Sequence, residues 1–362
     1  MTIFAFFRKI DGILLTASIL SVAVGLFSIY SITQGGPLQV KLTKQFIFLL
    51  IGMIGMGAVA YLDFRVLNHT QIIFFLYAVS NVLLAAVFFW GTEIRGVSQW
   101  FRIGPLSFQP VEFAKITSIL ILAKYFSMRH IEIARFRHIL VSGFYIALPV
   151  VLLLLQPDLG SISIFIILWA GTMIIAGIRI RHLAMLTGAG IVIAVLAWTL
   201  VLKDYQKDRI FTFLNPTRDP LGSSYNVSQS MIAIGSGGIW GKGLGMGTQS
   251  QAGFLPESTT DFIFASLTEE MGLVGGLFLF FLFGIFFWRL FRISTGAQNN
   301  FGRFIVVGVS LVFISEIFIN IGMTMGLFPV TGIPLPFVSY GGSALITSFV
   351  MLGLCQSINI YT

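Results

Sequence analysis

The chain has 362 residues, of which 56% are hydrophobic and only 10% charged, and its formal net charge is +8. A soluble domain carries about 25% charged residues, and the mean hydropathy here is +0.93. This composition excludes a soluble enzyme, a disordered protein and a nucleic-acid-binding module, and it predicts an all-α polytopic membrane protein. The single cysteine, Cys355, excludes an intrachain disulfide and a cysteine-based metal site.

Ten apolar runs follow one another along the chain, and each approaches the roughly 20 residues that a membrane-spanning helix needs. They cover residues 12–32, 45–62, 71–91, 111–127, 139–155, 161–178, 183–202, 271–291, 303–327 and 340–360. Backbone groups in hydrocarbon must be hydrogen-bonded internally, so each run is predicted to be a transmembrane helix of one domain, 1–362. The first run is read as a retained span rather than a signal peptide.

Basic residues are distributed unevenly between the two sides of the predicted bundle. With ten spans both termini share one side, which holds twelve Lys and Arg residues against three acids, whereas the other side holds ten against eleven. Cytoplasmic segments are enriched in Lys and Arg. Both termini are therefore predicted to be cytoplasmic, and topology explains the net charge, to which attraction to anionic membrane lipids adds.

The longest interruption, at about 203–265, is predicted to be a large extracytoplasmic loop between the seventh and eighth helices. Long loops in compact proteins are usually functional or disordered, and the apolar residues in this one indicate order at the membrane surface. All four histidines fall on the cytoplasmic side: His69, His130, His138 and His182. The outer side therefore has no histidine for base catalysis or metal binding.

Polar residues form a first outer cluster around the start of the fourth span, with Arg102, Gln109, Glu112 and Lys115. Glu112 and Lys115 are three residues apart and share a helix face. One interpretation is a local ion pair. The other is an anion site in which Arg102 and Lys115 face a phosphate-bearing lipid head group.

A second outer position is Asp158, which either caps the sixth helix or contacts substrate. The third cluster holds Glu257, Thr260 and Asp261 and continues to Glu269 and Glu270, so that four carboxylates lie within fourteen residues. Asp261 stands at the start of an apolar run. A carboxylate there suits a general base for a hydroxyl nucleophile, and the alternative is a helix-capping acid.

Two further features have open interpretations. The glycine-rich stretch 235–247 lacks the strand-and-helix context of a nucleotide fingerprint, which leaves a backbone nest for an anion or a closely packed loop. Glu316 lies inside the ninth span. An acid at that depth serves a proton relay or pairs with a neighbouring polar group.

Several phrases in these clusters resemble the SEDS family of shape, elongation, division and sporulation proteins, typified by RodA and FtsW, with RodA the more similar. They are Trp100-Phe101-Arg102-Ile103-Gly104-Pro105, Gln109-Pro110 through Lys115, Gln156-Pro157-Asp158-Leu159-Gly160, Leu255 through Phe264, and Gly332 through Ser343. The resemblance extends over essentially the whole chain.

The resemblance implies a ten-helix peptidoglycan polymerase of the bacterial cytoplasmic membrane, which joins lipid II units by inverting glycosyl transfer on the outer face for cell-wall elongation and shape. It implies a class B penicillin-binding protein as transpeptidase partner. The family's essential acid corresponds to Asp261, and its other motif positions correspond to Arg102, Glu112 and Lys115. We add Gln109, Asp158, Glu257 and Thr260 as expected substrate-binding residues; no metal ligand set is visible, although a divalent cation is left open.

One departure from the family pattern bears on mechanism, because Ser258 stands where the family usually has His. This favours a mechanism in which Asp261 acts without an imidazole.

Two other functions are considered beside the polymerase. A lipid II flippase or transporter is motivated by Glu316 and the helix-breaking glycines, and a non-catalytic scaffold for wall assembly would tolerate replacement of every outer acid.

Overall fold

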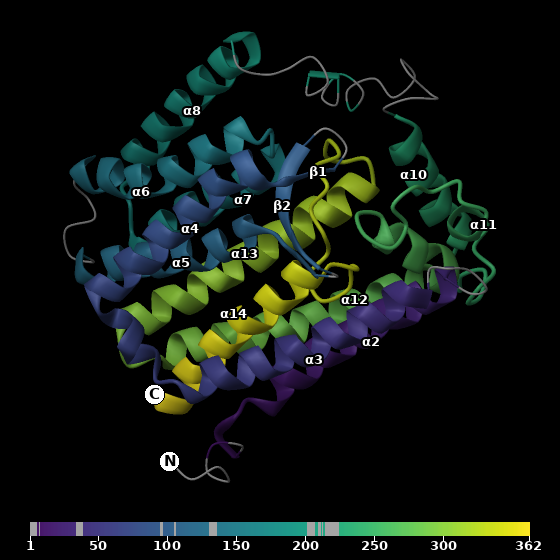
Figure 1. The fold of residues 1–362 in the computed structure, drawn as a ribbon, viewed down its shortest axis with the longest axis horizontal. Helices are drawn as coiled ribbons and strands as arrows, with labels where there is room; N and C mark the ends of the chain where they lie inside the picture. The colour runs from purple at the N-terminus through teal and green to yellow at the C-terminus, as the bar shows by residue number, and fades with distance from the viewer. Residues whose placement is uncertain are drawn as a thin grey trace.

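The computed structural model of the chain describes residues 6, 8–33, 39–94, 97–104, 106–129, 136–200, 207–208, 211, 213 and 224–362. These residues form a bundle of long helices with one small sheet at its side (Figure 1). The helices are α2 (Gly12–Ile32), α3 (Gln39–Tyr61), α4 (Thr70–Trp90), α5 (Pro110–Arg129), α6 (Phe136–Leu155), α7 (Leu159–Ala176), α8 (Ile180–Leu200), α10 (Tyr225–Gly237), α11 (Thr248–Gln251), α12 (Ile263–Gly296), α13 (Asn300–Thr324) and α14 (Gly342–Tyr361), with a 3₁₀ turn η1 (Phe64–Asn68).

Within the described part of the chain, eight helices are long and apolar enough to cross a membrane: α2, α3, α4, α6, α7, α12, α13 and α14. The polytopic all-α class is therefore confirmed. Helices α5 and α8 coincide with the two remaining predicted runs, but α5 carries Glu112, Lys115 and Lys124. The exact number of ten spans stays a prediction.

The start of α2 and the end of α14 lie at the same end of the bundle, and α10 and α11 lie at the other (Figure 1). The carboxylate of Asp11 caps the start of α2 by accepting from the amide of Leu14, and it also pairs with Arg289 of α12. Lys9 donates to the carbonyl of Ile360 at the end of α14. These contacts hold the first and last spans together at one end.

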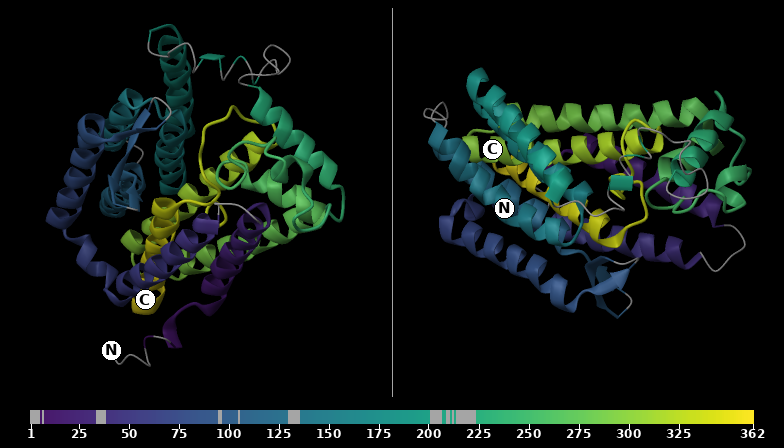
Figure 2. Two further views of the ribbon diagram at one scale, coloured as in Figure 1. Left: turned by 45° about the vertical axis from the view of Figure 1, so that its right-hand side comes forward. Right: turned by 90° about the horizontal axis from the view of Figure 1, so that it is seen from above.

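Helices α13 and α14 form the centre of the bundle. Of the residues in their most apolar stretches, 72% and 78% are buried, against 28% in α3. Helix α3 packs along α14, α2 along α12, and α5 along α13, whereas α8 lies at the outer edge (Figure 2). The central position of α13 explains how one polar residue of that helix can reach α5 and another can reach the loop that follows α13.

A three-stranded antiparallel sheet, which the sequence analysis did not predict, precedes α5. Strands β1 (Thr92–Ile94), β2 (Val97–Ile103) and β3 (Leu106–Phe108) are arranged in the order β1-β2-β3. In β2 and β3, Phe101 pairs with Phe108 and Arg102 with Ser107. Strands β1 and β3 have three residues each, too few to produce a recognisable alternation in the sequence.

The described part of the predicted outer loop is ordered and ends close to the expected position at about 265, whereas the following helix starts before the predicted apolar run. Helix α12 begins at Ile263 rather than near 271, and α10 packs against its first turns. At Gly237 of α10, a β-carbon would lie 2.0 Å from the carbonyl oxygen of Thr268, so only glycine permits this contact. Most of the loop before residue 224 lies outside the described residues.

Helix α12 is interrupted at Gly272, whose φ of +66° and ψ of −164° are not helical. The segment 237–243 supplies partners for the backbone groups that this break frees. The amide of Lys242 donates to the carbonyl of Glu269, and the amide of Leu273 donates to the carbonyl of Gly238. The glycine-rich stretch is therefore a closely packed loop, as one of its two interpretations stated.

Candidate active site

The turn that contains Asp261 is held by its backbone. Three consecutive carbonyl oxygens accept hydrogen bonds: that of Thr259 from the Tyr340 amide (2.9 Å), that of Thr260 from the Ser339 hydroxyl (2.6 Å) and that of Asp261 from the Asn320 side-chain amide (2.9 Å). We call this set of three bonds the carbonyl clamp. It joins the turn before α12 to α13 and to the segment before α14, and it fixes the position of the Asp261 main chain.

The carboxylate of Asp261 is half-buried beside the loop that follows α13. A β-carbon at Gly332, which has a φ of +73°, would lie 3.6 Å from its Oδ2 atom. The same Asn320 side chain that holds the Asp261 carbonyl also donates to the carbonyl of Ile333, at 2.7 Å. A buried amide thus fixes both the catalytic candidate and the loop that faces it.

Glu257 and Thr260 belong to the same turn as Asp261. The Thr260 hydroxyl donates to Oε2 of Glu257 at 2.9 Å, and the Glu257 carbonyl accepts from the amides of Thr260 and Phe262. Glu257 has a φ of +52°, in a region that residues other than glycine rarely adopt. Such strain collects at functional sites, and the structure brings these three predicted residues together.

Lys115 lies in a buried cluster with two carboxylates. Its Nζ atom is 2.7 Å from Oε1 of Glu112 and 2.5 Å from Oε1 of Glu316, and all three side chains are at most 5% exposed. The ion-pair interpretation of Glu112 and Lys115 is therefore confirmed, and Glu316 of α13 pairs with Lys115 of the neighbouring helix α5. A contact of Lys115 or Glu112 with substrate stays a prediction.

Asp158 caps α7, as one of its two interpretations stated. Its carboxylate accepts from the amide of Ser161 at 3.0 Å and from the Ser161 hydroxyl at 2.8 Å. Burial raises the pKa of Asp158 above its ordinary value, while the Ser161 bonds and the charge of Lys115 act in the opposite direction. At Gly160 a β-carbon would lie 3.0 Å from the carbonyl of Thr331, so the start of α7 contacts the loop that faces Asp261.

Arg102 and Gln109 lie toward the edge of this end of the bundle. The Arg102 side chain is exposed on β2, so it does not share one surface with the buried Lys115. The backbone amide of Gln109 donates to the hydroxyl of Ser343 in the first turn of α14 at 3.1 Å, and that hydroxyl donates to the carbonyl of Ser107. Through Ser343 the sheet and α5 are joined to the segment that carries the carbonyl clamp.

Two of the four outer carboxylates serve the fold of the glycine-rich loop. Glu269 is fully buried, and it accepts hydrogen bonds from the Lys242 ammonium and from the amides of Gln249 and Ser250. Glu270 accepts from the hydroxyl of Ser31 at 2.7 Å. They therefore anchor the loop rather than join the Asp261 turn.

Lys41 is a site candidate that the sequence analysis missed. It is half-buried at the start of α3, its Nζ atom donates to the Thr259 hydroxyl at 3.1 Å, and it lies 5.8 Å from the centre of the Tyr340 ring. Lys41 thus places a cation two residues from Asp261. The one signal in the sequence was a lysine at the outer end of an apolar run, and that signal is unspecific.

A metal centre has no ready ligand set in the described part of the chain. There, no three His, Cys, Asp or Glu side chains converge on one point that an ion could occupy. A divalent cation at this site stays a prediction.

Comparisons with known proteins all lead to one protein family, and the similarity extends over most of the chain. A family model described as "Cell cycle protein", FtsW/RodA/SpoVE, matches residues 10–362. Peptidoglycan glycosyltransferase MrdB from Escherichia coli K12 is 40% identical over 291 residues, which is 79% of this chain and 77% of MrdB. Stage V sporulation protein E from Bacillus subtilis 168 is 34% identical over 362 residues, which is 97% of each chain.

Solved structures are similar over nearly the full length. A chain of a structure that describes the coordination of polymerization and crosslinking by a peptidoglycan synthase complex has a TM-score of 0.82 and 31% identity, and the match covers 97% of both chains. Rod shape determining protein RodA from Thermus thermophilus has a TM-score of 0.72 and 29% identity, and the match covers 97% of this chain and 96% of RodA.

Proposed function

The chain belongs to the FtsW/RodA/SpoVE family of cell cycle proteins, and from this membership we infer that it is a peptidoglycan glycosyltransferase that serves cell-wall elongation and cell shape. Relatives with that activity in their names match most of the chain. The substrate is lipid II, a disaccharide carried on a polyprenyl pyrophosphate, and the product is a glycan strand.

The protein is a multi-pass membrane protein, and we assign it to the bacterial cytoplasmic membrane with both termini in the cytoplasm. The start of α2 and the end of α14 share one end of the bundle (Figure 1), and the predicted loops on that side carry the excess of Lys and Arg. Asp261 and the carbonyl clamp lie at the other end, toward α10 and α11. This orientation puts the reaction on the outer face, where lipid II units are joined.

Asp261 is the proposed general base. The 4-hydroxyl oxygen of the acceptor sugar attacks the anomeric carbon of the donor and forms the new glycosidic bond. The bond from that carbon to the pyrophosphate oxygen breaks with inversion, the hydroxyl proton passes to Asp261, and polyprenyl pyrophosphate leaves. The carbonyl clamp carries this assignment, because catalysis needs a reacting group held in position before the reaction begins.

The leaving pyrophosphate gains negative charge, and cations near Asp261 stabilise it. Lys41 is proposed for this role because it is anchored on the Asp261 turn through Thr259. Arg102 is proposed to contact the substrate from the exposed edge, where its planar guanidinium suits phosphate oxygens. Glu257 and Thr260 shape the turn.

The buried cluster of Lys115, Glu112 and Glu316 is proposed to act by positioning. Glu316 and Asn320 are four residues apart on α13, so they lie on one face of that helix one turn apart. Lys115 joins α5 to α13 directly below the amide that holds Asp261. This pairing also accounts for an acid within a span, which was one of the two reasons to consider a flippase.

A crosslinking partner is proposed, a class B penicillin-binding protein that acts as transpeptidase. It is supported by the similarity to a chain of a peptidoglycan synthase complex that coordinates polymerization and crosslinking. The described residues leave large apolar side chains exposed along α12, among them Phe278, Phe281 and Phe291. In a membrane these side chains contact lipid or another apolar helix.

The polymerase and flippase functions are separated by two assays of the same purified protein. Polymerisation of lipid II is followed on gels, and reorientation of lipid II is followed in vesicles. The isosteric variant Asp261→Asn, which cannot accept the proton, is expected to lose polymer formation. Full polymerisation by that variant would eliminate the general-base role, and lipid II transport without any polymer from the wild type would favour a flippase.

A further inference from the structure

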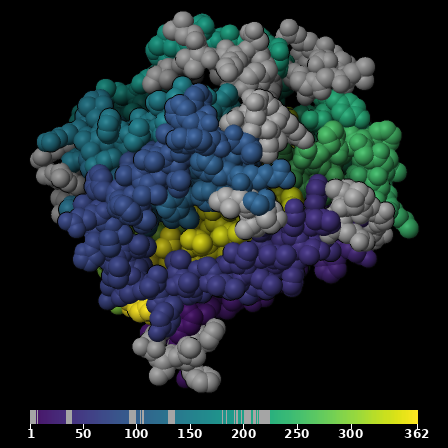
Figure 3. All heavy atoms as spheres, in the orientation of Figure 1, coloured from purple at the N-terminus to yellow at the C-terminus, as the bar shows by residue number. Residues whose placement is uncertain are grey.

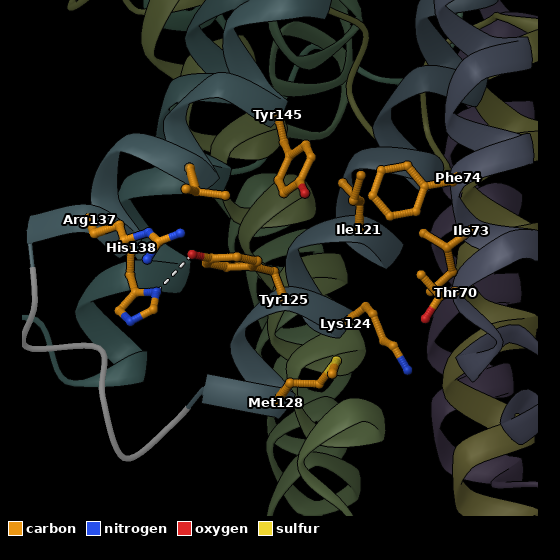
Figure 4. A pocket seen from close by; sticks show the side chains of 11 residues that line it. Thr70, Ile73, Phe74, Ile121, Lys124, Tyr125, Met128, Arg137, His138 and Tyr145 are labelled. Atoms are coloured by element: carbon orange, nitrogen blue, oxygen red, sulfur yellow. Dashed lines mark hydrogen bonds between the residues drawn. The ribbon is translucent and has the colours of Figure 1, made fainter.

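A cavity lies at the end of the bundle that is remote from Asp261, between α4, α5 and α6 (Figure 4). Its volume is about 290 Å³. Lys124, on its wall, is nine residues beyond Lys115 on α5, and nine residues of helix span about 13 Å. The proposed reaction uses none of its lining residues, among them Thr70, Phe74, Lys124, Tyr125, Arg137 and His138.

Two cations line this cavity, Arg137 from α6 and Lys124 from α5, and they lie on opposite sides of Tyr125 (Figure 4). No carboxylate is among its described lining residues. The Lys124 ammonium donates to the backbone and side-chain oxygens of Asn68, at 2.6 and 2.9 Å, which leaves one of its three N–H groups for a ligand. Arg137 is exposed, and among the described residues it forms no ion pair.

The backbone adds to this positive field. Thr70 is the first residue of α4, whose capping residue His69 makes no side-chain hydrogen bond, and Arg137 lies in the first turn of α6. The first residues of two long helices thus line the cavity, and the N-terminal end of a helix carries a partial positive charge. The end of α5 has the opposite polarity, and there Lys124 places a full positive charge.

The rest of the cavity is apolar and opens toward the membrane. Figure 4 shows Phe74 and Ile121 on one side and Tyr145 above Tyr125 on the other. The Tyr145 ring packs against Phe74 and Tyr125, and the Tyr125 hydroxyl and Nδ1 of His138 are 2.8 Å apart. Phe74 is 44% exposed and Met128 65% exposed, so the outer wall faces the surrounding lipid.

We propose that this cavity binds an anionic phospholipid of the leaflet on the side of the termini. The phosphodiester lies between Arg137 and Lys124, and the start of one acyl chain packs against Phe74 and Ile121. Charge complementarity favours this occupant, because basic pockets between transmembrane helices bind anionic head groups. A free phosphate would use the two cations alone and would leave the apolar wall without a partner.

Lipid retention by the purified full-length protein tests this site. The protein is exchanged into detergent with equal amounts of phosphatidylglycerol and phosphatidylcholine of identical chains, and bound lipid is measured by native mass spectrometry. The wild type is expected to retain phosphatidylglycerol in preference. Arg137→Gln and Lys124→Gln are each expected to lower that retention about fivefold, the loss that one basic group near an anionic head group implies.

Arg303→Gln is the matched control, because Arg303 is an exposed cation on α13 that does not line the cavity. It is expected to retain phosphatidylglycerol as the wild type does, and thermal unfolding of each variant verifies that it is folded. Equal retention of the two lipids, or folded Arg137 and Lys124 variants with wild-type retention, would overturn the proposal. Displacement of phosphatidylglycerol by millimolar inorganic phosphate would also overturn it, because the site would then bind a free anion.

Discussion

Replacement of Asn320 by Leu is predicted to reduce catalysis without a change at any group that touches the reactants. Leu has nearly the shape of Asn, so the change leaves little cavity, but it removes the side-chain amide that donates to Asp261 and Ile333. Asn320 is fully buried, and both of its neighbours are acceptors at 2.9 and 2.7 Å.

The size of the expected fall in kcat follows from the two carbonyl oxygens that lose their hydrogen-bond donor. A buried acceptor left without a donor costs about 1–3 kcal/mol, which gives about 2–6 kcal/mol if nothing moves. The structure relaxes instead, and the Asp261 turn moves away from the 331–333 loop. A misplacement of about 1 Å costs about a hundredfold in rate, equal to about 2.7 kcal/mol of activation free energy. We therefore expect kcat to fall about a hundredfold while KM changes little.

The assay is steady-state polymerisation of lipid II, with thermal unfolding measured on the same preparations. Ser310→Ala is the control on α13, because the Ser310 hydroxyl bonds only to the Val306 carbonyl one turn back. It should behave as the wild type. A folded Asn320→Leu protein with unchanged kcat would refute the positioning argument, and a rise in KM alone would assign Asn320 to binding.

Three further predictions follow from the site and the fold. Lys41→Gln removes a cation beside the Asp261 turn and should lower kcat/KM for lipid II about ten- to a hundredfold, since hydrogen bonds to charged groups contribute about 1.5–3 kcal/mol. An unchanged kcat/KM in the polymerisation assay would exclude a role of Lys41 in stabilising the leaving pyrophosphate. Lys115→Met leaves two buried carboxylates unpaired and should destabilise the protein by about 3–5 kcal/mol in thermal unfolding. Adding Glu316→Gln to that variant should recover part of the lost stability. Unchanged stability of the single variant would contradict the buried pairing. Gly237→Ala forces α10 away from α12 and should lower the free energy of unfolding by about 1–3 kcal/mol. Gly235→Ala is the control, because a β-carbon there meets nothing within 4 Å, and it should be neutral or stabilising. Equal effects of the two substitutions would refute the close contact.

The sequence was sufficient for the features that depend on local pattern. Apolar runs located the spans because a bilayer demands about 20 apolar residues from each, and α2 begins and ends at the residues expected. The capping role of Asp158 could be anticipated because an aspartate directly before a helix accepts backbone amides. The start of α12 was placed too late because the acids at 269 and 270 interrupt the apolar run, although both are buried against the glycine-rich loop.

Features that join distant segments could not be predicted. Glu316 and Lys115 are 201 residues apart, and spacing alone gave no reason to pair them. The carbonyl clamp uses the main chain of Thr259, Thr260 and Asp261, whose carbonyls carry no sequence signal. Lys41 was overlooked for the same reason, since its role depends on the packing of α3 beside the Asp261 turn.

The most direct test of the central claim is a gel assay of glycan products from purified protein and lipid II. It compares the wild type with Asp261→Ala, each with and without a class B penicillin-binding protein. We predict polymer from the wild type and none from the variant, with the two proteins equally folded. Polymer from the variant at the wild-type rate would contradict the role of Asp261, and no polymer from the wild type even with the partner would contradict the assignment as a polymerase.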